Sequence, residues 1–311
     1  MQKALRAEIF LITKDNDYQM AQASSVEESA RSLGVEVKIS FAHNDSVEKS
    51  QRVLECIQRG PDKRPSAIIL QAVGKTSLPQ VARAAVDAGI GWCLLNQADY
   101  IGELRKCGKA PVFCIAPDNL EVGHVEGRQI GVLLPNGGTV LYIQGPSENV
   151  HSTLRTVGMH ETKPLAVQVR AMRTSDWTEA SAFNAVTSWL QLSTSRHAQI
   201  DLVAAQSDLM AIGARKAFEE FSKTDPSTRW TSLPLLGVDG LPKTGQAWVR
   251  SGLLTATVVQ PCTAGRALEV MVQAVRTGTP PAELTLMPVQ SFPTLDALAA
   301  TRKSGKAAGA K

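Results

Sequence analysis

Polar and aromatic side chains follow the short apolar runs of this 311-residue chain, and their chemistry suits the binding of a ligand. The candidates are Asp15, Asn16, Tyr18, Asn96, Trp177, Ser207, Asp239 and Gln260. Carboxylates and amides suit a ligand with many hydroxyl groups, because each hydroxyl both donates and accepts hydrogen bonds. The aromatic faces of Tyr18 and Trp177 suit the apolar C–H faces of a sugar ring.

Turn and capping roles are a second explanation for several of these side chains, because Asp, Asn and Ser are common in turns and at helix N-termini. Capping is the favoured interpretation for Asp45, Asp118 and Asn119. The sequence supports capping and ligand binding equally for Asn96, Asp208 and Asp239. Trp177 begins a predicted helix, where packing in the core is the default.

The apolar runs predict strands, and helix-patterned segments separate them. The runs are Ile9–Thr13, Val35–Phe41, Ala67–Gln71, Trp92–Asn96, Val112–Ala116, Val140–Gln144, Ala166–Arg170, Leu202–Gln206, Leu235–Val238, Ala256–Gln260 and Leu286–Phe292. This alternation predicts an α/β fold of two similar Rossmann-like lobes, each a parallel sheet with helices on both faces. Ligands of such sheets bind outside the carboxyl ends of the strands, where the polar candidates lie.

Helix punctuation agrees with this alternation. Gly34 follows the first helix pattern, Asp45 and Glu48 form a start that resembles a capping box, and Pro79 opens the third helix. Later helices are predicted over Glu121–Leu134, Trp177–Leu192, Leu209–Ser222 and Thr263–Thr277.

Catalytic signatures are missing from the sequence. It has no Gly-x-Gly-x-x-Gly after a strand, no phosphate loop, no His-Glu-x-x-His and no Gly-x-Ser-x-Gly elbow. The dispersed histidines show no metal-binding spacing. Together with the architecture, this favours a binding protein over an enzyme, with no catalytic residue, no metal and no cofactor. An enzyme on the same scaffold is the weakest alternative, with Asp208 or Asp239 as its carboxylate.

Composition narrows the partners and the compartment. A net charge of +4 with scattered basic residues does not indicate nucleic-acid binding, and no apolar stretch is long enough to span a bilayer. No signal peptide is visible, so the protein is cytosolic or its leader is absent from this chain. Cys107 and Cys114 flank a loop and could pair, and the basic tail Arg302–Lys311 is expected to be frayed.

Several motifs, in their order and spacing, resemble one family along nearly the whole chain. They include Ala116-Pro117-Asp118-Asn119-x-x-x-Gly123, Arg155-x-x-Gly158 after a strand, Ala205-Gln206-Ser207-Asp208-x-Met210-Ala211-x-Gly213, Gly237-Val238-Asp239-Gly240 and Ala256-Thr257-Val258-Val259-Gln260. The chain resembles the type I periplasmic sugar-binding proteins, together with the effector domains of lac-repressor-type regulators. The resemblance implies ligand contacts at Asp15–Tyr18, Asn96, Trp177, Ser207, Asp239 and Gln260.

Departures from the family pattern bear on which sugar is bound. Thr153 stands where ribose-type relatives place a sugar-binding arginine, Ser207 replaces the usual Asn, and Asn96 replaces the usual Asp. The family also implies three crossings between the lobes, near Ala116–Asp118, Asp239–Gln260 and Pro288–Phe292. The expected N-terminal lobe is 1–117 plus 261–289, and the C-terminal lobe is 118–260 plus 290–311.

The expected function is hinge-coupled binding of a small sugar or polyol between the lobes and its delivery to an ABC permease. The resemblance implies a monomer in the periplasm or another extracytoplasmic compartment. The main alternative is a ligand-sensing module, either a receptor for a sensor kinase or the effector domain of a regulator. The segment Met1–Ala7 is too short to hold a helix-turn-helix before the first strand.

Overall fold

The computed structural model describes residues 5–43, 45–72, 78–96, 99–196, 198–225 and 229–308. The chain divides into two compact units, each built from separate stretches of sequence. The first unit comprises Met1–Pro117 and Cys262–Met287, and the second comprises Asp118–Pro261 and Pro288–Lys311. Pro261, Pro288 and Val289, which the sequence prediction assigns to the first lobe, belong to the second unit.

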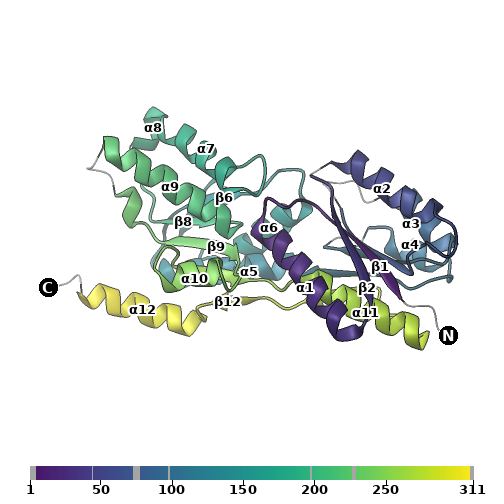
Figure 1. Ribbon diagram of the computed structural model, residues 1–311. Helices are drawn as coiled ribbons and strands as arrows, with labels where there is room; N and C mark the ends of the chain where they lie inside the picture. The colour runs from purple at the N-terminus through teal and green to yellow at the C-terminus, as the bar shows by residue number, and fades with distance from the viewer. Residues whose placement is uncertain are drawn as a thin grey trace. The chain divides into compact units, whose positions relative to one another are not determined.

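The first unit is a six-stranded sheet in the order β11-β5-β4-β3-β1-β2, and its strand pairs are parallel. Figure 1 shows β1 and β2 of this sheet. Its strands are β1 (Arg6–Leu11), β2 (Glu36–Phe41), β3 (Ala67–Gln71), β4 (Gly91–Leu95), β5 (Val112–Pro117) and β11 (Leu284–Met287). Its helices are α1 (Asp17–Leu33), α2 (Ser46–Gln58), α3 (Pro79–Asp87), α4 (Ile101–Arg105) and α11 (Thr263–Thr277).

Helices cover both faces of this sheet, which explains why its inner strands are apolar throughout rather than alternating. Phe10, Trp92 and Leu94 face the core formed with α2, α3 and α4. Ile9 and Cys93 face the opposite core, formed with α1 and α11. Figure 1 shows α1 and α11 side by side, although they are far apart in the sequence.

The second unit is a six-stranded sheet in the order β12-β10-β9-β8-β6-β7. Its strands are β6 (Gly138–Gln144), β7 (Val167–Arg173), β8 (Leu202–Ala205), β9 (Leu235–Asp239), β10 (Ala256–Val259) and β12 (Gln290–Phe292), and β12 alone is antiparallel to its neighbour. Its helices are α5 (Asn119–Leu133), α6 (Val150–Thr162), α7 (Glu179–Leu190), α8 (Ser193–Arg196), α9 (Asp208–Thr224), the 3₁₀ turn η1 (Trp230–Ser232), α10 (Gly245–Arg250) and α12 (Leu295–Ala308).

The two faces of the second sheet are also covered by helices. Phe218 of α9 and Val186 of α7 pack on one face, and Ile130 of α5, Met159 of α6 and Leu298 of α12 pack on the other. The predicted α/β fold with two parallel sheets is therefore confirmed, with β12 as an antiparallel edge strand.

The prediction of a single strand over Leu286–Phe292 is wrong. The segment forms β11 in the first sheet and β12 in the second, and Pro288 lies between them. Proline lacks the N–H that a continuous ladder needs, so the strand ends there. The second crossing was expected near Asp239–Gln260. In the structure β9 and β10 pair in the second sheet, and the chain leaves that unit after Pro261, next to Gln260.

The tail and one helix start also differ from expectation. Residues of the predicted frayed tail continue α12 as far as Ala308, and this helix is anchored by the buried side chain of Leu298. Trp177 does not begin a helix, because Thr178 caps α7 through a hydrogen bond to the Ser181 N–H. Cys107 and Cys114 remain thiols and form no disulfide.

Candidate functional site

The carboxyl ends of the second sheet carry a connected set of polar side chains. Asp239 is the last residue of β9, and its Oδ1 accepts a hydrogen bond from Gln260 Nε2 at 2.5 Å. The backbone of Asp239 has φ = 115°, a value that side-chain-bearing residues rarely adopt. Such strain persists only where the surrounding structure enforces it, and it is common at functional sites. Asp239 does not cap α10, whose N-cap residue is Thr244.

Arg155 of α6 forms hydrogen bonds to several members of this set. It was not among the predicted site residues. Its Nη2 donates to Gln260 Oε1 at 3.1 Å, its Nη1 to the Gln206 carbonyl at 2.6 Å, and its Nε to Asn119 Oδ1 at 3.0 Å. Only 5% of its surface is exposed. Each nitrogen of this buried guanidinium is therefore bonded to an oxygen of the protein itself.

Trp177 packs beside this arginine. The guanidinium carbon of Arg155 lies 5.4 Å from the centre of the Trp177 ring, within the range of a cation–π interaction. The ring also covers Gly145, where a Cβ atom would approach it to 2.4 Å. Because the indole contacts the core of α7 and α9 as well, Trp177 combines partial packing with partial exposure.

Asp208 is buried and holds the local backbone and side chains in place. Its Oδ2 accepts from the Gly240 N–H at 2.8 Å and its Oδ1 accepts from Thr257 Oγ1 at 2.6 Å. Burial, and then the nearby charge of Asp239, raise the pKa of Asp208 well above its usual range. A Cβ at Gly237 would come within 2.2 Å of this carboxylate, so the glycine is needed for the close approach.

Ser207 precedes α9 and is 2% exposed. Its hydroxyl oxygen has no hydrogen-bond partner among the residues that the structure describes, and it makes no capping bond. A buried polar atom without a partner is rare in folded proteins. It leaves Ser207 able to bond a ligand or a water.

Beneath these side chains lies a buried hydrogen-bonded network. Gln206 Nε2 donates to Tyr142 Oη at 2.9 Å, and the Tyr142 hydroxyl donates to Glu126 Oε2 at 3.2 Å. Burial raises the pKa of Glu126 to about 8, against the opposing effect of the Arg155 charge. The other oxygen of Glu126 has no partner among the described residues.

Asn119 does not cap a helix, contrary to the expectation from the sequence. It lies inside the first turn of α5, and Asp118 caps this helix by accepting from the Glu121 N–H. Asn119 instead bonds Arg155 and lies 3.0 Å from His151 Nδ1 through its own Nδ2. The capping predicted for Asp45 and Asp118 is confirmed, and that for Asn119 is wrong.

The first unit carries the other predicted residues at the carboxyl ends of its strands. Asn16 caps α1, accepting from the Tyr18 and Gln19 N–H groups, and Asp15 is exposed beside Thr13. Tyr18 is buried at 7% exposure. Asn96, at φ = 71°, accepts from Thr263 Oγ1 at 3.3 Å. Asp15, Asn16 and Tyr18 follow β1 whereas Asn96 follows β4, with β3 between the two strands.

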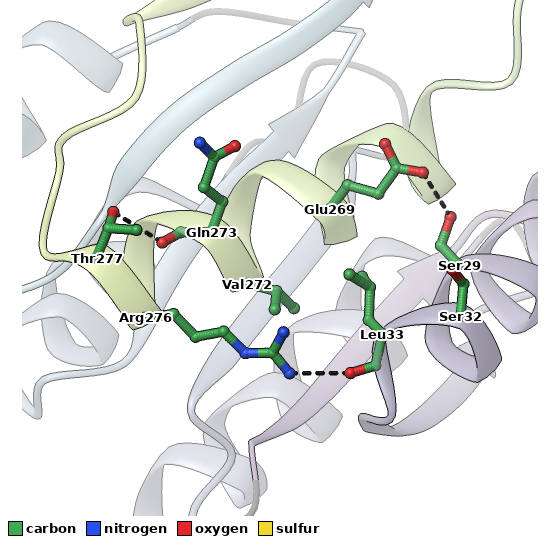
Figure 2. Close-up of a pocket in the computed structure, with 8 residues that line it drawn as sticks. All are labelled: Ser29, Ser32, Leu33, Glu269, Val272, Gln273, Arg276 and Thr277. Carbon is green, nitrogen blue, oxygen red and sulfur yellow. Dashed lines mark hydrogen bonds between the residues drawn. The ribbon is translucent and has the colours of Figure 1, made fainter.

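A groove of about 410 Å³ lies elsewhere on the first unit (Figure 2). Figure 2 shows it between the C-terminal halves of α1 and α11, where Arg276 donates to the Leu33 carbonyl and Ser29 to Glu269. Both helices start at the carboxyl ends of the strands, so the groove is at the opposite end of the sheet. None of the predicted site residues lines it.

The described part of the chain offers neither a metal-binding group nor a membrane-spanning helix. No three His, Cys, Asp or Glu side chains there are grouped to hold a metal ion. None of the described helices has the length and apolar composition that a membrane span requires.

The sequence is similar to those of two binding proteins. The D-allose-binding periplasmic protein of Escherichia coli is 27% identical over 276 residues, covering 87% of this chain and 84% of that protein. The xylitol-binding protein of Mycolicibacterium smegmatis is 30% identical over 238 residues, covering 74% of this chain and 60% of that protein.

Similarity of structure extends over the fold. An ABC transporter periplasmic solute binding protein from Actinobacillus succinogenes with bound D-allose superposes with a TM-score of 0.78 at 18% identity, covering 92% of this chain and 96% of that one. The periplasmic binding protein domain family matches residues 8–279. Because this match spans most of the sequence, the chain belongs to the periplasmic binding protein domain family.

Proposed function

We propose that this protein binds a sugar or polyol and delivers it to an ABC importer. The observation that carries the proposal is the cluster of Asp239, Gln260 and Trp177 around Arg155 at the carboxyl ends of the second sheet. Family membership makes the protein a binding protein, and relatives named for D-allose and xylitol support a polyhydroxylated ligand.

The chemistry of this cluster suits hydroxyl groups. An ionised carboxylate accepts hydrogen bonds only, and charge-assisted bonds are roughly twice as strong as neutral ones. Trp177 offers an aromatic face for the C–H groups of a ring. Three of the five N–H donors of Arg155 are bonded to protein oxygens, and two remain. The relatives named for D-allose and xylitol favour an uncharged ligand.

The remaining parts of the proposal rest on the family. Asp15, Asn16, Tyr18 and Asn96 supply ligand contacts from the first unit, and Ser207 adds one from the second. Hinge closure, a monomeric state, a periplasmic location and an ABC permease as partner complete the proposal.

A thermal-shift screen tests the proposed function directly. Its panel contains D-allose, D-ribose, xylitol and myo-inositol, with D-glucuronate as an anionic member. A sugar at about 100 times its dissociation constant should add roughly 2.7 kcal/mol to the free energy of unfolding. Stabilisation by no neutral sugar or polyol, or by D-glucuronate alone, would contradict the proposal.

Asp239→Ala is expected to weaken binding of the sugar found in this screen. The loss should be about 1.5–3 kcal/mol for each charged hydrogen bond removed, measured by titration calorimetry. The unfolding free energy without ligand should change less than the binding free energy does.

Asp201→Ala is the matched control for this substitution. Asp201 lies in the same unit but at the opposite, amino end of the strands, where its Oδ2 accepts from the Thr139 N–H at 2.8 Å. This variant should lose about 1 kcal/mol of stability and no affinity. An Asp239→Ala protein that binds as tightly as the wild type would remove Asp239 from the site.

A further inference from the structure

We propose that His124 is a pH-sensitive clip between α5 and α6, in which the doubly protonated ring bonds Glu121 through one nitrogen and Glu161 through the other. This inference goes beyond the proposed function and needs no ligand. Its basis is the position of the imidazole ring between two carboxylates: Nδ1 lies 2.8 Å from Glu121 Oε2, and Nε2 lies 2.6 Å from Glu161 Oε2. Glu121 and His124 belong to α5, whereas Glu161 belongs to α6.

The chemistry of the two contacts requires the charged form of the ring. An ionised carboxylate can only accept hydrogen bonds, so both nitrogens of His124 must carry a proton to bond both carboxylates. A neutral imidazole has one N–H, and its other nitrogen would present a lone pair to a carboxylate oxygen. Loss of the second proton therefore breaks one bond and removes the charge that strengthens the other.

The charged groups around the ring favour its protonated form. Glu121 and Glu161 face it, and the other oxygen of Glu121 accepts a hydrogen bond from Arg128. Lys163, which follows α6, donates instead to two backbone carbonyls of its own segment. Helix α12 also packs on α5, and none of its charged side chains that the structure describes bonds the ring. Hydrogen bonds to Glu161 and then to Glu121 raise the pKa of His124 above the usual 6.5, against the opposing effect of burial.

The backbone beneath the ring is attached to α6 at every pH. The His124 carbonyl accepts a hydrogen bond from Thr162 Oγ1 at 2.9 Å, and a Cβ on Gly158 would come within 2.9 Å of the His124 nitrogen. Because the helices touch here, the ring needs little reorganisation to reach Glu161. The His124 side chain is 22% exposed, so its proton can exchange with the solvent.

The direction of the pH effect follows from the raised pKa of His124. The folded protein binds this proton more tightly than the unfolded chain does. The contribution of the clip to the free energy of unfolding is therefore fully present below the usual pKa of 6.5 and is lost as the pH rises through the folded pKa. The effect falls on the helix that opens the second unit, because α5 follows directly after Pro117 and Asp118, where the chain leaves the first unit.

The first measurement is an NMR titration of the histidine rings in the full chain, assigned by triple-resonance experiments. In the wild type His124 should titrate above 6.5, whereas His160, whose pKa is lowered by burial and by the charge of Lys163, should titrate below it. Glu161→Gln removes a charge and keeps an acceptor oxygen, so it should move the titration of His124 to lower pH. A wild-type His124 that titrates at or below 6.5 would overturn the inference.

The second measurement is a double-mutant cycle between His124 and Glu161, because Glu121 keeps Arg128 as a second partner. At pH 6, Glu161→Gln should lower the melting temperature by about 1–3 °C, the effect of one partly exposed ion pair. In the His124→Gln background the same substitution should have a clearly smaller effect. The coupling should shrink between pH 6 and pH 9. Equal effects of Glu161→Gln in both backgrounds at pH 6 would contradict the clip.

Glu219→Gln is the matched control, because Glu219 is also a partly exposed helix carboxylate in an ion pair, with Arg215 at 2.8 Å. This variant should leave the titration of His124 unchanged. If His124→Gln does not fold, the titrations of the wild type and of Glu161→Gln decide alone. A His124 that titrates at the same pH in the wild type and in Glu161→Gln would then overturn the inference.

Discussion

Glu126→Gln is expected to stabilise the protein at pH 8 and to leave its stability little changed at pH 4.5. Burial raises the pKa of Glu126 from the usual 4.5 to about 8, so the folded protein holds this proton over a range in which the unfolded chain has released it. The contribution of Glu126 to the free energy of unfolding is fully present below about pH 4.5 and is lost as the pH rises towards about 8. Each pH unit between these two pKa values costs about 1.4 kcal/mol, so the loss of unfolding free energy is at most roughly 5 kcal/mol.

The neutral side-chain amide of glutamine does not titrate in this pH range. It keeps an oxygen that can accept a hydrogen bond from the Tyr142 hydroxyl. The difference in unfolding free energy between Glu126→Gln and the wild type should therefore grow in favour of the variant between pH 5 and pH 8, as measured by urea denaturation. Other titrating groups are common to both proteins and cancel in this difference. A difference that does not vary with pH would show that Glu126 is not held in its neutral form.

Glu121→Gln on the same helix is the control. Glu121 is partly exposed in ion pairs with Arg128 and His124. Burial acts to raise its pKa, but the hydrogen bonds to His124 and Arg128 together lower it. Its contribution should be below about 1 kcal/mol and of opposite sign, present at neutral pH and lost as the pH falls.

Gly123→Ala is expected to destabilise the protein strongly, by about 3 kcal/mol, at the upper part of the usual range for overpacking. Helices α5 and α6 pack with their backbones almost in contact here. A Cβ on Gly123 would lie 2.1 Å from the Arg155 carbonyl oxygen and 2.8 Å from the Met159 nitrogen. Gly158 faces it from α6, where a Cβ would lie 2.1 Å from the Leu120 carbonyl. The methyl group can enter only if the helices separate.

Gly131→Ala is the matched control on the same helix, because its Cβ would meet only the Pro164 ring, at 3.4 Å. This substitution should stabilise by about 0.5–1 kcal/mol, since alanine loses less conformational entropy in a helix. Thermal unfolding of the two variants should thus shift in opposite directions. A Gly123→Ala protein as stable as the wild type would show that the two helices can separate without loss.

The sequence predicts the architecture well because both sheets are buried on both faces. The inner strands are therefore largely apolar, and the helices carry clear caps and glycine stops. The error over Leu286–Phe292 has a local cause, since one apolar run contains the end of one strand and the start of another around Pro288. The apolar pattern alone does not show that the two halves belong to different sheets, although the family resemblance placed a crossing near Pro288–Phe292.

The contacts at the site were harder to predict, because the residues concerned are far apart in the chain. Arg155 and Gln260 are separated by 105 positions, and Arg155 and Gln206 by 51. The motif Arg155-x-x-Gly158 gave a signal for Arg155, but the helical pattern does not show that its side chain reaches Gln260, just after β10. Asn119 was misplaced for a smaller reason: a one-residue shift of the helix start moved it from the cap into the first turn.

The use of α11 in the first unit also affects the order in which the chain folds during synthesis. Ala267, Leu268 and Met271 of this helix complete the core against Cys93 and Phe113. When Pro117 has left the ribosome, that face of the sheet still lacks one of its two covering helices. The missing helix emerges only after Cys262, by which time β6 to β10 of the second unit have been made. The unit that contains β1 to β5, which are made before β6 to β10, therefore completes its core only after those later strands have been made.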